Sequence, residues 1–159
     1  MNLSKSEKTT GIILASLLLL ITLTSTFFFL GKLKISMIEW IAFNSCSPSS
    51  FLYLIFFIIF LINKKGALLS ITALPLYYLG TMSMFVLPWS GNYVVAHIGH
   101  IIMTLNIIWV FLVLLKHKEY RAMALGLLTG ILLFVPFIAY VQTYNKIHEE
   151  QFTRLFMQK

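Results

Sequence analysis

The sequence is poor in cysteine and in charge, and each shortage excludes a class of site. A single thiol, Cys46, allows no intrachain disulfide and no metal or redox motif built from two cysteines. Asp and Glu together number only 5, and no acidic or basic residue falls in the middle of a long apolar run. A proton relay made of intramembrane carboxylates is therefore excluded.

Recognisable catalytic signatures are also missing. The sequence has no phosphate-binding glycine loop, no nucleophile elbow and no zinc-protease helix motif. This favours a protein that is not an enzyme, and it leaves the polar residues inside the apolar runs as the candidates for chemistry.

Apolar residues are what the chain has in plenty. They make up 59% of it, charged residues make up 11%, and the mean hydropathy is +0.89, whereas a soluble domain is roughly 25% charged. A water-soluble fold of this size could not bury so much apolar surface. We therefore expect one polytopic membrane domain over residues 1–159, with the lipid bilayer as its main partner.

The net charge of +7 lies in short runs between the apolar blocks, which is typical of positive-inside anchoring. Binding to nucleic acid would call for a basic face instead, so we expect no nucleic-acid partner. The chain is then an all-α integral membrane protein, because backbone groups in lipid must be satisfied internally and the blocks lack the alternation of barrel strands.

Five apolar blocks can be distinguished. A hydrocarbon core about 30 Å thick needs roughly 20 helical residues, and the blocks predict membrane spans at residues 11–30, 48–62, 67–87, 93–115 and 122–141. We interpret the first block as a retained helix, because it is longer than the apolar part of a signal peptide and no cleavage site follows it. Polar turns between the second and third and between the fourth and fifth spans predict two helical hairpins, with Pro75 and Pro136 as kinks.

The positions of lysine and arginine predict the orientation. One side would hold Lys5, Lys8, Lys64, Lys65, Lys116, Lys118 and Arg121, and the other Lys32, Lys34, Lys146, Arg154 and Lys159. Since both short hairpin turns on the first side are basic, we expect a cytoplasmic (inner) membrane protein with its N-terminus inside and its C-terminus outside.

Two segments are too polar to cross the membrane. Residues 32–46 place Glu39 and Trp40 among isoleucines, which predicts a short amphipathic helix in the outer interface. Residues 145–159 mix apolar and charged residues, and they predict an amphipathic tail.

Two histidines stand inside the fourth span, where ionisable groups are costly and are functional candidates. His97 and His100 are three positions apart, so they lie about 60° round the helix and about 4.5 Å along it, on one face. Tyr93 and Thr104 continue this face. In the expected topology it lies near the outer interface, and we expect a polar pocket lined by Tyr93, His97, His100, Thr104 and Glu39.

Three interpretations of the histidines stay open. They form hydrogen bonds that join helices, or they bind a transition metal with a third ligand such as Glu39 or Cys46, or they line a solute pocket or act as a protonation switch. Haem held by both is not what we expect, because two ligands on one helix face cannot reach opposite faces of a porphyrin. One histidine with a ligand from another chain remains open.

The functional hypotheses follow from these interpretations. The first is a permeation or binding component, or an accessory subunit of a larger membrane complex, with a polar site near the outer face. The alternative is a metal- or haem-dependent membrane redox enzyme or subunit that uses His97 and His100.

Small residues recur every four positions at the start of the fifth span, at Ala122, Gly126 and Gly130. This spacing is typical of membrane helices that pack closely. It predicts a helix-packing face, either inside the monomer or at the seam of a homo-oligomer.

Overall fold

The computed structural model describes residues 1–89 and 93–157, and this part of the chain is all-helical, with 85% helix and no strand. The elements in chain order are α1 (Lys5–Thr26), η1 (Phe27–Lys32), α2 (Met37–Phe43), α3 (Cys46–Asn63), α4 (Ala67–Ser70), α5 (Ala73–Leu76), η2 (Tyr77–Thr81), α6 (Ser83–Val86), α7 (Tyr93–Lys116), α8 (Tyr120–Ile147) and α9 (Glu149–Met157). The elements η1 and η2 are π-helical.

Five helices of the described chain are long and apolar enough to cross a membrane, and they cover Lys5–Lys32, Cys46–Asn63, Ala67–Val86, Tyr93–Lys116 and Tyr120–Ile147. The prediction of five long apolar helices is confirmed, although several ends differ. The first helix begins earlier than expected because Ser4 and Glu7 form a capping box, in which Glu7 accepts a 2.7 Å hydrogen bond from the Ser4 amide.

The third long helix is interrupted, and the sequence suggests why. It consists of α4, α5, η2 and α6, with a break at Ile71 and Thr72. Pro75 has no amide hydrogen to donate to the carbonyl of Ile71, so the regular hydrogen-bond ladder cannot continue there. By contrast, α8 runs through Pro136 as one helix.

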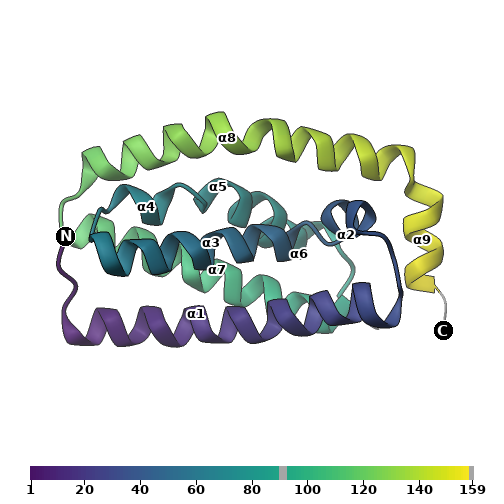
Figure 1. Cartoon of the computed structure of the whole chain (residues 1–159), viewed down its shortest axis with the longest axis horizontal. Coiled ribbons are helices and arrows are strands. Elements are labelled where there is room, and N and C mark those ends of the chain that lie inside the picture. The colour runs from purple at the N-terminus through teal and green to yellow at the C-terminus, as the bar shows by residue number, and fades with distance from the viewer. Residues whose placement is uncertain (90–92, 158–159) are drawn as a thin grey trace.

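The long helices run side by side in alternating directions (Figure 1). One end, here called the basic end, holds the chain's N-terminus and the α3–α4 and α7–α8 turns. The opposite end, here called the histidine end, holds α2, α6, the first turns of α7 and α9. Met1 and the last described helix, α9, therefore lie at opposite ends of the bundle.

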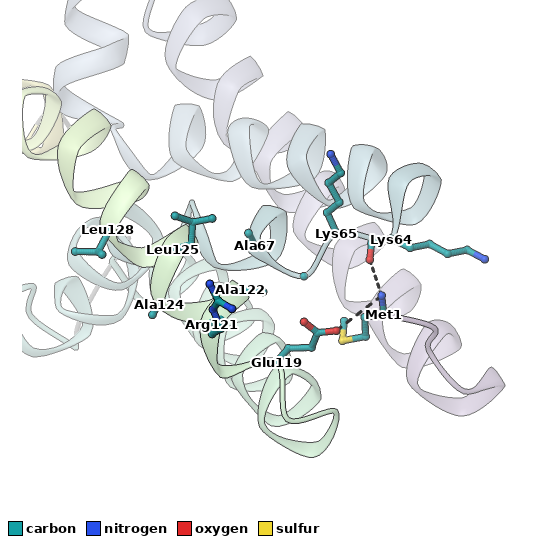
Figure 2. A pocket seen from close by; sticks show the side chains of 11 residues that line it. Met1, Lys64, Lys65, Ala67, Glu119, Arg121, Ala122, Ala124, Leu125 and Leu128 are labelled. Atoms are coloured by element: carbon teal, nitrogen blue, oxygen red, sulfur yellow. Dashed lines mark hydrogen bonds and ion pairs between the residues drawn. The ribbon is translucent and has the colours of Figure 1, made fainter.

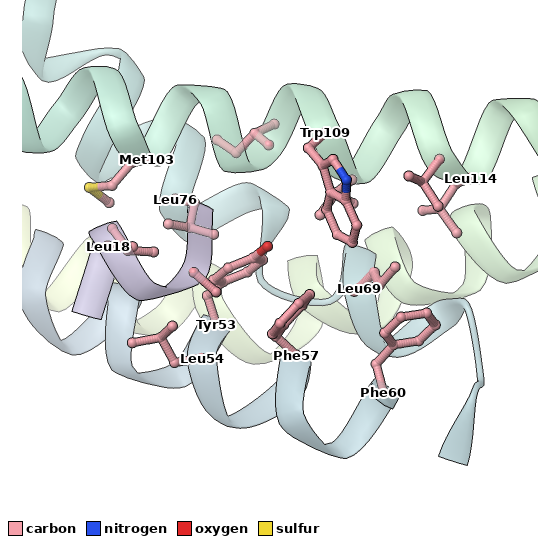
Figure 3. Close-up of a cluster of buried hydrophobic side chains, with 14 residues drawn as sticks. Leu18, Tyr53, Leu54, Phe57, Phe60, Leu69, Leu76, Met103, Trp109 and Leu114 are labelled. Atoms are coloured by element: carbon pink, nitrogen blue, oxygen red, sulfur yellow. The ribbon is translucent and has the colours of Figure 1, made fainter. Parts of the chain in front are cut away.

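The largest apolar core lies between α1, α3, α4, α5 and α7 (Figure 3). In it Phe57 of α3 meets Trp109 of α7 edge to face, with ring centroids 5.7 Å apart. The central helix is α7: half of its most apolar window is buried, compared with 22% for α1 and for α8.

The two polar segments are helical at the histidine end. In α2, Ser36 and Glu39 form a second capping box, and Trp40, Ala42 and Phe43 are buried. The tail forms the end of α8 and then α9. A smaller apolar cluster joins α2 to this tail, where Phe43 packs against Tyr144 and Phe152.

Candidate binding site at the buried histidines

The histidine pair is buried on the inner side of α7. His97 is 0% exposed and His100 is 5% exposed. Their rings meet edge to face, with centroids 5.9 Å apart and planes at 73°. The i, i+3 spacing thus places the two imidazoles against each other.

The short segment before α7 covers His97. The Trp89 indole stacks on the imidazole at a centroid distance of 3.9 Å and an angle of 8°, and the His97 Nε2 lies 3.2 Å from the Pro88 carbonyl oxygen. The indole is itself fixed, because its N–H donates to the Met84 carbonyl at 2.9 Å. Trp89 is 60% exposed on its other side, so it separates His97 from the surroundings of the bundle.

These contacts assign a hydrogen-bonding role to each nitrogen of His97. A carbonyl oxygen only accepts, so Nε2 carries the proton, and Nδ1 of the neutral ring is then an acceptor. Among the residues that the structure describes, Nδ1 of His97 has no hydrogen-bond partner, and the same is true of Nδ1 of His100. The site therefore contains two buried polar atoms with unused hydrogen-bonding capacity.

Thr104 follows His100 by one turn of α7, and its side chain connects α7 to η2. Its hydroxyl donates to the His100 carbonyl at 2.8 Å, and its oxygen lies 2.9 Å from the Thr81 hydroxyl. Because Thr104 has only one hydroxyl hydrogen, Thr81 is the donor in the second bond. Tyr93, the first residue of α7, is half-buried.

Glu39, which we expected in the same pocket, takes part in a different junction. Its carboxylate accepts from the Ser36 amide at 2.7 Å and from the Gln151 side-chain amide of α9. The Ser36 hydrogen bonds are the main cause that holds the pKa of Glu39 below its usual range. Glu39 thus caps α2 and contacts the tail.

The structure gives no support for metal binding. In the described parts of the chain, no three residues of the types His, Cys, Asp and Glu are grouped so that they could hold an ion. Of the expected third ligands, Glu39 is occupied as described, and the Cys46 thiol donates to Asn44 Oδ1 at 3.1 Å.

Sequence analysis missed another buried polar residue of α7. Asn106 is 0% exposed, and its side-chain amide donates to the carbonyls of Ile102 at 2.9 Å and of Leu14 in α1 at 3.3 Å. Its own carbonyl oxygen has no partner among the described residues. The sequence did contain an indication of this residue. Asn106 is a lone amide in an apolar run, and placing an amide side chain there is costly unless neighbouring helices supply hydrogen-bond partners.

Sequence analysis also missed the ion pairs of the basic end. Glu7 of α1 lies 2.8 Å from the Lys116 ammonium and 3.1 Å from His117 Nε2. The Met1 amino group lies 2.7 Å from the Lys64 carbonyl oxygen and 3.9 Å from Glu119. These contacts join the start of α1 to both turns of the basic end.

The small residues of α8 face the interrupted third helix. A Cβ built on Gly126 would lie 2.3 Å from the Ala67 carbonyl oxygen, and one on Gly130 would lie 2.2 Å from the Ile71 carbonyl oxygen. Ala122 is close to Gly66, whose built Cβ would be 3.4 Å away. This face therefore packs within the chain.

Comparisons with known proteins add nothing to these contacts. The chain matches no protein-family model, no curated protein and no solved structure. Its function has to be argued from the site itself.

Proposed function

We propose that this chain is a non-enzymatic binding component of a membrane, and that its site at His97 and His100 takes a small solute bearing a hydrogen-bond donor such as an amine, amide or hydroxyl. One observation carries the proposal: the Nδ1 atoms of both histidines are buried without a partner in the described chain. A buried polar atom without a hydrogen bond costs about 1–3 kcal/mol. A bound donor would remove this cost, and Nδ1 of His97 is an acceptor that suits it.

The surroundings of the pair are consistent with binding rather than with catalysis. The His97 ring lies between Trp89 and His100, and Thr104 uses its only hydrogen on the His100 carbonyl. Within the described residues, no carboxylate or thiol contacts either imidazole, so a general base or nucleophile paired with them is not part of this arrangement.

The test is a search for bound solute in the detergent-purified full-length chain. We expect wild type to release a small molecule on denaturation, measured by mass spectrometry. We also expect members of a panel of small amines, amides and polyols to raise its unfolding temperature, because a ligand that binds the native state stabilises it. The variant His97→Phe/His100→Phe should lose both effects.

The control is His148→Phe, which removes an imidazole at the same end but keeps a ring stacked on Tyr144, where the centroids lie 4.1 Å apart. It should behave as wild type. If no compound is released and no panel member stabilises wild type more than the double variant, the histidines serve only helix packing and the proposal is wrong.

We also propose that the chain spans the cytoplasmic membrane with its N-terminus inside. The support is the basic end, where contacts of Glu7 and Met1 bring together the turns that carry Lys64, Lys65, Lys116, Lys118 and Arg121. Short basic loops are retained on the cytoplasmic side. The histidine end would then face outward.

Thiol labelling of intact cells tests this orientation. In a Cys46→Ser background, Glu150→Cys should react with a membrane-impermeant reagent, whereas Lys118→Cys should react only after permeabilisation. The reverse pattern would overturn the orientation. Reaction of both without permeabilisation would overturn a membrane-spanning arrangement.

A further inference from the structure

A pocket lies at the basic end, away from the histidines. Its volume is about 600 Å³, and it opens between the α3–α4 turn and the first turns of α8. Figure 2 shows Lys64 and Lys65 on the side of the turn, and Arg121, Leu125 and Leu128 on the side of α8.

The rim of this pocket is positively charged. Lys64, Lys65 and Arg121 are all exposed, and in the described chain no carboxylate lies within ion-pair distance of their side-chain nitrogens. Glu119 is the one acidic residue of the lining, and its carboxylate lies 3.9 Å from the Met1 amino group. Three cations against one carboxylate attract an anion.

The start of α8 adds to this attraction. Glu119 stands at the N-cap of α8, but its side chain forms no capping hydrogen bond. The backbone N–H groups in the first turn of α8 therefore receive no hydrogen-bond acceptor from the Glu119 side chain. They point toward the end of α8 that lines the pocket. Free amides at a helix start favour anions, phosphate groups in particular.

The remaining lining is apolar and continues along α8. Leu125 is 62% exposed and Leu128 is 60% exposed, and with Ala122 and Ala124 they form the α8 side of the pocket beyond Arg121. From Arg121 to Leu128 the helix rises about 10 Å. A ligand that fits this surface has a phosphate at one end and a hydrocarbon chain at the other.

We propose that this pocket binds an anionic phospholipid, with its headgroup phosphate between Lys65 and Arg121 and one acyl chain along Leu125 and Leu128. The pocket has the charge and the apolar surface that such a molecule needs. Basic pockets at helix ends next to apolar helix sides are a known form of lipid recognition. Phosphate headgroups occur in both leaflets, so the proposal does not depend on the orientation proposed above.

Native mass spectrometry of the full-length chain in mild detergent tests this proposal, with phosphatidylglycerol as the probe. Lys65→Gln/Arg121→Gln should weaken phosphatidylglycerol binding roughly ten- to thirtyfold, since each basic residue near a headgroup contributes appreciably to binding. The matched control, Lys5→Gln/Lys118→Gln, removes two exposed cations of the same end that do not line the pocket. It should bind as wild type.

Two further probes separate the lipid from its phosphate. Phosphatidylcholine should not bind at the concentrations at which phosphatidylglycerol does, and millimolar inorganic phosphate should not displace phosphatidylglycerol. Displacement by inorganic phosphate would show a site for the free anion and overturn the lipid assignment. Equal losses in the two double variants, or no loss in either, would overturn the pocket as the binding site.

Discussion

Two consecutive helices, α7 and α8, are buried in different ways. Half of the most apolar window of α7 is buried, but only 22% of that of α8. The buried residues of α7 cover a broad arc, with Asn106 about 180° away from His97, and they leave one exposed face that carries Leu105, Ile108 and Leu112. Those of α8 form a single line of positions spaced by three or four: Gly126, Gly130, Phe134, Ile138 and Val141.

The two helices also contact their neighbours through different atoms. On α8, two glycines meet the backbone carbonyls of Ala67 and Ile71. On α7, side chains make the contacts: Met103 packs against Gly80, and His100 and Asn106 are buried polar residues. The comparison suggests that buried polar groups require a central helix, whereas a narrow strip of small residues is enough to fix a peripheral one.

The largest effect that we expect is from Gly126→Ala. Its new Cβ would lie 2.3 Å from the Ala67 carbonyl oxygen and 2.1 Å from Ser70 Oγ, and a backbone carbonyl cannot move aside cheaply. The free energy of unfolding should fall by about 3 kcal/mol, the upper part of the usual range for overpacking. Denaturant unfolding in detergent measures it.

Gly80→Ala is the control for that prediction. Its new Cβ would lie 2.7 Å from the Met103 methyl carbon and 2.9 Å from its sulfur, at the flexible end of that side chain, and 3.1 Å from the Met103 Cβ, a tight contact that a small shift relieves. Ala also favours a helix over Gly by up to about 1 kcal/mol, so the net change should stay within about 1 kcal/mol of zero. If Gly80→Ala costs as much as Gly126→Ala, the distinction between side-chain and backbone contacts fails.

The sequence was sufficient to predict the long helices. Apolar blocks of the right length identified them, and polar turns identified the hairpins. The start of α1 at Lys5 was missed because the capping box of Ser4 and Glu7 adds a polar turn to an apolar helix. The break at Ile71 and Thr72 was predicted only as a kink, since the sequence shows Pro75 but not how far its missing hydrogen bond disturbs the helix.

The site was less accessible to sequence reasoning. The i, i+3 spacing predicted that His97 and His100 share a face, because this follows from helix geometry alone. Sequence could not indicate that Trp89 stacks on His97, because that contact depends on the path of the chain before α7. Glu39 was assigned to the same pocket from its expected depth alone, and depth does not indicate which residues a side chain contacts: those of Glu39 are Ser36 and Gln151.

The smallest effect that we expect concerns the C-terminal end of α8. There, contacts with α2 and α9 add to the packing of Gly126 and Gly130, here called the glycine strip. Asn145 of α8 donates to the Ala42 carbonyl at 3.2 Å, and Glu39 of α2 accepts from Gln151 of α9. Glu39→Gln keeps an oxygen that can complete the capping box but removes the charge. We therefore expect a loss of a few tenths of a kcal/mol at pH 7.

The pH dependence gives this prediction its sign. The pKa of Glu39 is lowered in the folded chain, mainly by hydrogen bonds from Ser36, so its charge stabilises the fold above its unfolded pKa. That contribution is lost as the pH falls through the lowered value, so the difference between wild type and Glu39→Gln should shrink as the pH falls below the ordinary range of a glutamate. Glu150→Gln is the control, because it removes a carboxylate at the same end whose side chain is 90% exposed and, among the described residues, pairs with Arg154. A loss in Glu39→Gln as large as that in Gly126→Ala would mean that α8 is held by its far end, and that the glycine strip is not what fixes its position.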